Sequence, residues 1–139
     1  MFVNLAIKSN NMNKRIIIIA SMFAILAVIL GAFGAHGLKM LINTADLEIW
    51  NTAVEYHFYH TFALLYLSTF SRLKSRTINA ASWFFTCGIF FFSGSLYLLA
   101  IKDILFIKQF SIIGVLTPLG GFLFILGWIC LLAATIKNK

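Results

Sequence analysis

One apolar stretch of the chain carries three ionisable side chains. Within residues 50–70, Glu55, His57 and His60 stand among tyrosines. An ionisable group inside a membrane span costs roughly 2.5 kcal/mol or more, so each of them needs a partner or a function. A carboxylate near histidines suits proton handling or, with a further histidine, the binding of a metal or haem. The rest of the chain must supply the elements that position these groups.

Helical spacing sorts these residues onto faces. In an α-helix, residues three or four apart lie on the same side. Two neighbouring faces result, one formed by Ala53, Tyr56, His60 and Ala63, and the other by Glu55, Tyr59, Phe62 and Tyr66. His57 leaves the first face, and we expect it to point to the membrane interface. For His60 the alternatives are an interhelical hydrogen bond, which we favour, and a ligand. For Glu55 the alternative to a binding role is a carboxyl bonded to a side chain of another helix.

Four apolar runs are long enough to be helices that cross a bilayer, which needs about 20 residues each. They cover residues 16–35, 50–70, 80–101 and 111–136, after a flexible tail at 1–13. A cleavable signal peptide is the alternative for the first run. Pro118 either lies within one kinked fourth helix, which we favour, or begins a shorter one.

The composition is that of an integral membrane protein in a single domain. Of the 139 residues 61% are hydrophobic and only 11% are charged, against roughly 45–50% and about 25% in soluble domains. The net charge of +7 comes from short basic segments between apolar runs, which argues against nucleic-acid binding. Cys87 and Cys130 have no metal-ligand spacing and indicate neither a disulfide nor a metal site.

Basic residues give the orientation. On one side of the predicted membrane lie Lys8, Lys14, Arg15, Arg72, Lys74, Arg76, Lys137 and Lys139, and on the other only Lys39, Lys102 and Lys108. The positive-inside rule therefore predicts a four-helix transmembrane bundle, all-α, with both termini in the cytoplasm. Asn43 or Thr44 is the expected N-cap of the second helix.

With this topology, polar residues from separate helices come to the outer half of the bundle. The candidate binding residues are His36, Glu55, Tyr56, His60, Ser93, Ser95, Tyr97 and Thr117. Small residues mark close helix contacts, among them Ala27, Gly31, Ala35, Gly88, Gly120 and Gly127. Trp50, Trp83 and Trp128 are expected to face lipid or the interface.

Four motifs in order resemble a known family. They are the run from Gly31 to His36, Glu55-Tyr56 with His60-Thr61, the run from Phe92 to Tyr97, and Thr117-Pro118 with Gly120-Gly121 and Gly127-Trp128. Together they resemble the domain-of-unknown-function-423 family, small four-span inner-membrane proteins of bacteria similar to the eukaryotic transmembrane protein 256. The resemblance implies a four-helix plasma-membrane protein and no particular activity.

The sequence thus predicts a multi-pass protein of the bacterial inner membrane with a polar pocket in its outer half. We expect it to bind a lipid or small amphiphile, or to serve as an accessory to another membrane protein or a second copy. A small oligomeric proton-coupled transporter and a haem or metal protein are the alternatives. No catalytic constellation is visible, so neither an enzyme nor a cofactor is expected.

Overall fold

A computed structural model describes residues 13–70, 76–106 and 111–137, and the regular elements of this part of the chain are all helices, without strands. Of the predicted tail only Asn13 falls within it. The elements, in chain order, are α1 (Lys14–His36), η1 (Leu38–Met40), α2 (Thr44–Ser68), α3 (Arg76–Gly88), η2 (Ile89–Ser93), α4 (Gly94–Ala100) and α5 (Ser111–Lys137).

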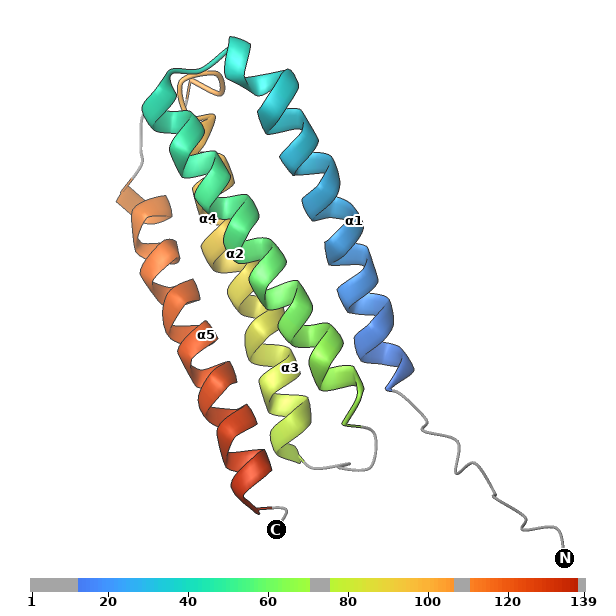
Figure 1. Cartoon of the computed structure of the whole chain (residues 1–139). Coiled ribbons are helices and arrows are strands. Elements are labelled where there is room, and N and C mark those ends of the chain that lie inside the picture. Colours follow the sequence, from blue (N-terminus) through green and yellow to red (C-terminus); the bar gives the residue numbers. More distant parts are fainter. Residues whose placement is uncertain (1–12, 71–75, 107–110, 138–139) are drawn as a thin grey trace, which may run out of the picture.

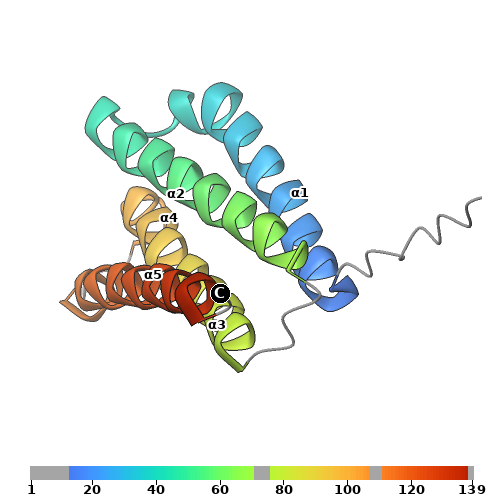
Figure 2. The same ribbon diagram turned by 60° about the horizontal axis from the view of Figure 1, so that its bottom comes forward.

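The long helices run side by side along one direction (Figure 1). α1 and α2 form one antiparallel pair, while α3, η2 and α4 follow one another as a single rod that pairs with α5 (Figure 2). This rod also packs against α2, so it lies between α2 and α5. α1 and α3 begin at the same end of the molecule, where α2 and α5 finish (Figure 1).

Local capping fixes where α2 begins. The Asn43 side chain accepts a hydrogen bond from the Asp46 N–H at 2.9 Å and donates one to the Asp46 carboxylate at 2.7 Å. Asn43 is therefore the N-cap, as predicted from sequence. The same carboxylate lies 3.3 Å from the Lys102 ammonium, which ties the start of α2 to the segment after α4.

Glycines let the rod and α5 approach closely. A Cβ at Gly120 would collide with the Phe92 backbone N and lie 2.7 Å from its Cα, and one at Gly127 would lie 2.6 Å from the Phe85 ring. Gly88 similarly accommodates the ring of Phe124. These contacts confirm the three glycines as helix-packing positions, the role that small residues have inside membranes.

The rod contains a π-helical turn at η2, which interrupts the regular α-helical ladder. Such turns insert one residue and rotate the side chains that follow, and they are frequent at functional sites. The turn ends at the fully buried Ser93 and includes Phe92, on whose backbone Gly120 packs. The sequence gives no sign of it.

In the described part of the chain, three of the predicted spans are helices long and apolar enough to cross a membrane. They are Lys14–Met40, Arg76–Ala100 and Ile113–Ile136. α2 is not among them, because acidic and aromatic polar residues lower its hydropathy. Of the four predicted spans, hydropathy therefore supports three clearly. α5 is one helix with Pro118 inside it, which confirms the single-helix alternative.

Candidate functional site

Some polar side chains of α2 are buried in the helix bundle, and others lie on its exposed face. His57, His60 and Thr61 are buried. Glu55, Tyr59, Phe62 and Tyr66, which sequence places on one face, are all exposed. Within the described chain no side chain bonds the Glu55 carboxylate, although we expected donors from neighbouring helices. Its direction away from the bundle makes this carboxylate available to something outside the chain.

His60 is held by two partners of different kinds. The Trp128 indole N–H donates to His60 Nε2 across 3.4 Å, and an indole nitrogen can only donate. The proton therefore sits on Nδ1, which donates to the Tyr56 carbonyl at 2.9 Å. The imidazole also stacks on Phe124, with ring centroids 3.4 Å apart. This network assigns a neutral imidazole that joins α2 to α5, the interhelical bond that the sequence left as an alternative.

A groove opens to the surface beside His60, between α2 and α5. Its volume is about 700 Å³, and its walls are mostly aromatic. The lining residues are Tyr56, Tyr59, His60, Phe92, Pro118, Gly121, Phe122, Phe124, Ile125 and Trp128. Tyr56 packs on Phe92 at 4.6 Å between centroids. Two predicted site residues, Tyr56 and His60, thus belong to one apolar groove with a few polar atoms.

Ser95 and Thr117 form a separate contact between α4 and α5. Their hydroxyl oxygens lie 2.6 Å apart. Because the Ser95 hydroxyl donates to the Phe92 carbonyl at 2.9 Å, Thr117 donates to Ser95. Every proton in this pair is used within the protein, so the pair stabilises helix packing beside η2.

His57 and Tyr97 make a third group, on the other side of α2. His57 Nδ1 lies 3.2 Å from the Tyr97 hydroxyl, and Trp50 packs on the Tyr97 ring at 4.7 Å between centroids. The prediction that His57 points to the interface was wrong, since only 1% of it is exposed. The prediction that Trp50 faces lipid or the membrane interface was also wrong. Its ring is buried in the space left by Gly34, and its N–H donates to the Leu30 carbonyl at 3.0 Å.

Some buried polar atoms have no hydrogen-bond partner in the described chain. They are His57 Nε2, Thr61 Oγ1, Thr86 Oγ1 and Ser93 Oγ. Ser93 lies one turn before Tyr97, and Thr61 lies one turn after His57 on the antiparallel helix α2. Because Tyr97 and His57 touch, Ser93 and Thr61 come to a similar level. A buried polar group without a hydrogen-bond partner costs roughly 1–3 kcal/mol. Packing alone therefore does not explain why polar residues occupy these positions.

His36 stands apart from the other candidates. It is the exposed last residue of α1, whereas His60 lies roughly 24 Å below the start of α2 at 1.5 Å rise per residue. The two histidines therefore do not face each other as axial or metal ligands. Among the described residues no group of three or more His, Cys, Asp or Glu is placed to hold a metal ion.

The structure thus distributes the eight predicted residues over an α2–α5 groove, an α4–α5 hydroxyl pair and an α2–α4 histidine–tyrosine contact. His36 and Glu55 are exposed, and Ser93 is buried without a hydrogen-bond partner among the described residues. They do not form one pocket, because Tyr56 and His60 lie toward α5, whereas Tyr97 contacts His57 on another side of α2. Sequence reasoning missed Trp128 and His57 as partners. His60 and Trp128 stand 16 and 17 residues after the first residues of α2 and α5, and this similar depth was the available signal for Trp128.

Comparison with known sequences shows one family. Residues 30–121 match the family described as "Protein of unknown function (DUF423)". The chain is 45% identical over 124 residues to UPF0382 membrane protein SAB0533 of Staphylococcus aureus, covering 89% of this chain and 97% of that protein. It is 42% identical over 126 residues to UPF0382 membrane protein YwdK of Bacillus subtilis, covering 89% and 98%. No solved structure matches.

Proposed function

Because this chain belongs to the DUF423 family of bacterial membrane proteins, whose function is unknown, we propose from its own geometry that it binds a single-chain amphiphile or lipid. The chain of the ligand lies in the α2–α5 groove, and its head group carries an amine or another hydrogen-bond donor. The open aromatic groove of about 700 Å³ is the observation that supports this proposal.

The groove suits a hydrocarbon chain. Gly121 has no side chain and therefore leaves space on one side of the groove. The apolar surface comes from Phe92, Phe122, Phe124, Ile125 and Trp128. Ligand sites commonly combine such apolar walls with a few polar groups that fix orientation. Here the tyrosine hydroxyls of the lining supply those groups. We therefore propose a binding role for this groove.

Glu55 lies beside the groove, not in its lining, and we place the head group of the ligand at this carboxylate. Glu55 is next to Tyr56 and one helical turn before Tyr59, and both tyrosines line the groove. Its carboxylate is exposed and unpaired within the described chain. In a membrane such a group requires a cationic or hydrogen-bonding partner. An amine head group meets that requirement, whereas a fatty acid would place two carboxylates together.

The proposal includes the membrane arrangement. α2 packs along α1 over its length and against the rod, so we propose that it crosses the inner membrane as a fourth span. Basic residues concentrate at the end where α1 and α3 begin, which favours a cytoplasmic location for that end. Glu55 and the start of α2 then belong to the outer half.

A proton-coupled transporter is the second candidate. The unpartnered buried atoms of His57, Thr61 and Ser93 favour it, since chains of polar groups inside a bundle serve proton relays. Proton uptake by liposomes that contain the protein would support the transporter. Amphiphile binding without proton uptake would instead support the proposed amphiphile-binding function.

A quenching experiment tests the groove. A bromine-labelled single-chain amine is added to the detergent-solubilised protein, with the bromine-labelled fatty acid of equal length as comparison. We expect the amine to quench tryptophan fluorescence at lower concentration, and the quenched component to disappear in Trp128→Phe. Glu55→Gln should raise the apparent Kd of the amine about tenfold, the equivalent of roughly 1.4 kcal/mol.

Matched variants separate binding from folding. Gly121→Leu fills the groove where a Cβ has room, since its nearest contact is the Phe92 ring at 3.7 Å. Gly114→Leu adds the same group on α5 where nothing lies within 4 Å. Only the former should abolish quenching. Equal quenching by amine and fatty acid, unchanged in Glu55→Gln and Gly121→Leu, would refute the proposed function.

A further inference from the structure

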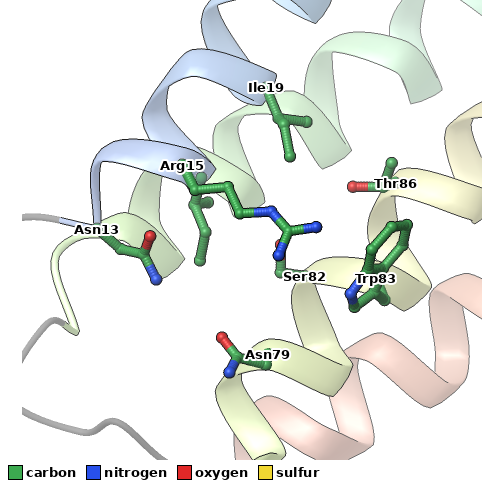
Figure 3. A pocket seen from close by; sticks show the side chains of 8 residues that line it. Asn13, Arg15, Ile19, Asn79, Ser82, Trp83 and Thr86 are labelled. Carbon is green, nitrogen blue, oxygen red and sulfur yellow. The ribbon is translucent and has the colours of Figure 1, made fainter.

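A small polar pocket lies at the opposite end of the bundle from the start of α2. It occupies about 90 Å³ between the beginning of α1 and α3, room for roughly three water volumes of about 30 Å³ each. Its polar lining comes from Asn13, Arg15, Asn79, Ser82 and Thr86 (Figure 3). None of the residues of the candidate site in the α2–α5 groove takes part.

The donors of this pocket are free to bind an anion. The Arg15 guanidinium lies over the Trp83 ring, 5.2 Å from its centroid, and the described chain offers it no carboxylate. Asn13 is the N-cap residue of α1, yet its side chain makes no capping hydrogen bond. The first turn of α1 contains no acidic residue. A helix N-terminus with an arginine and free amide groups attracts negative charge.

Thr86 gives an independent indication of a ligand. Its side chain is 9% exposed and its hydroxyl has no partner within the described chain. Figure 3 shows this hydroxyl on the side of the Arg15 guanidinium. An unpaired buried hydroxyl is costly in the protein alone, and a bound acceptor would offset that cost.

The pocket continues into an apolar groove between α1 and α3. This groove has a volume of about 640 Å³ and shares Ile19, Trp83 and Thr86 with the pocket. Its other lining residues are Met22, Phe23, Ile25, Leu26, Ile29 and Phe90. The contact of Phe23 with Phe90, at 5.4 Å between ring centroids, joins α1 to η2 along the groove. A polar, cationic end and a long apolar extension thus form one continuous surface.

We propose that this surface is a binding site for an anionic phospholipid. The phosphate lies among Arg15, Asn13 and the Thr86 hydroxyl, and one acyl chain follows the groove along α1 toward Ile29. Arg15 is at the level where an apolar helix begins, which is where lipid phosphates lie. A soluble phosphate would use only the pocket and leave the groove without a role. The two parts together therefore indicate a lipid rather than a free anion.

Lipid-dependent thermal stability tests the proposal. Delipidated protein in a non-ionic detergent is heated with phosphatidylglycerol, with phosphatidylcholine of the same chains, or with inorganic phosphate. We expect phosphatidylglycerol to raise Tm most and inorganic phosphate to have no effect. Arg15→Gln should weaken phosphatidylglycerol binding at least about fivefold, since a basic residue near an anionic surface contributes about 1 kcal/mol. Lys14→Gln removes the same charge from the adjacent residue, which is also exposed but does not line the pocket, so it should change binding less than about twofold.

Two further variants keep the test independent of folding. Thr86→Val retains the shape and removes the unpaired hydroxyl, so the lipid-free protein should be at least as stable as before while phosphatidylglycerol protects less. Ile25→Trp should obstruct the groove, whereas Val28→Trp, at an equally exposed position outside it, should not. The proposal is overturned if the two lipids protect equally, if Arg15→Gln and Lys14→Gln behave alike, or if inorganic phosphate protects as well as phosphatidylglycerol.

Discussion

At the scale of single residues, His60 is defined by what surrounds it. Its Nδ1 donates to a carbonyl of its own helix, its Nε2 accepts from Trp128, and its ring stacks on Phe124. Both nitrogens of a neutral imidazole are therefore used. This makes His60 a link between α2 and α5 at the wall of the proposed amphiphile groove, and it leaves no lone pair for a metal.

A double-mutant cycle measures that link. His60→Phe retains a ring on Phe124 but removes the acceptor, and Trp128→Phe removes the donor. We expect a coupling free energy of about 0.6 kcal/mol, the average for interhelical hydrogen bonds in membranes. The measurement is the free energy of unfolding by SDS for the two single variants and the double variant. Strictly additive effects would show that the 3.4 Å contact contributes nothing to stability.

Glu55 has a different role from His60 despite their proximity in sequence. Five positions rotate a helix by about 500°, so the two side chains leave α2 in different directions. His60 enters the bundle and Glu55 faces outward. Stability arguments therefore concern His60, whereas Glu55 matters only if something outside the chain binds to it.

At the scale of elements, the contact between η2 and α5 depends on a glycine. The α5 backbone at Gly120 meets the backbone of Phe92, and the hydroxyl pair of Ser95 and Thr117 lies beside this contact. The π-helical turn and the close approach occur at the same place. Any side chain at Gly120 must push α5 away, because backbone atoms cannot move aside as a flexible side chain can.

Alanine substitutions test this contact. Gly120→Ala should destabilise the protein by about 1–3 kcal/mol, the usual cost of overpacking. Gly94→Ala is the control in the adjoining helix α4, where an added Cβ would meet nothing within 4 Å. There the gain in helix propensity should stabilise by up to about 1 kcal/mol. Thermal unfolding in detergent checks both, and equal effects of the two variants would contradict the close packing.

At the scale of the whole molecule, the arrangement of the helices leaves grooves on two sides. α1 pairs with α2, the rod pairs with α5, and the rod also touches α2. One groove lies between α2 and α5 and the other between α1 and α3. Both proposed ligands thus reach their sites from the membrane, where hydrocarbon chains are already present.

Labelling of α2 tests the proposed topology. Cysteines replace Ala45 and Thr69, exposed residues near its two ends, in a background without Cys87 and Cys130. In intact cells an impermeant thiol reagent should label position 45, and position 69 should react only after permeabilisation. Labelling of both positions from outside would show that α2 does not cross, and the reverse pattern would invert the orientation.

The amino-acid sequence by itself determined the class of protein and the position of its helices. Long apolar runs specify helices in a membrane because backbone groups must bond within their own segment there. The cap at Asn43 and the packing glycines of the rod and α5 could also be predicted, since both depend on local residue types. The four motifs sufficed to identify the family.

Only the tertiary structure decided which faces turn inward. Helical periodicity placed Glu55 with Tyr59 and His60 with Tyr56, but it could not tell which set lies inside. In soluble proteins water distinguishes the faces, whereas in a membrane lipid and interior are both apolar. The rotation of α2 follows instead from steric fit, such as Trp50 in the space at Gly34. That fit buries His57 beside Tyr97 and leaves Glu55 exposed, because shape rather than hydropathy selects the contacts.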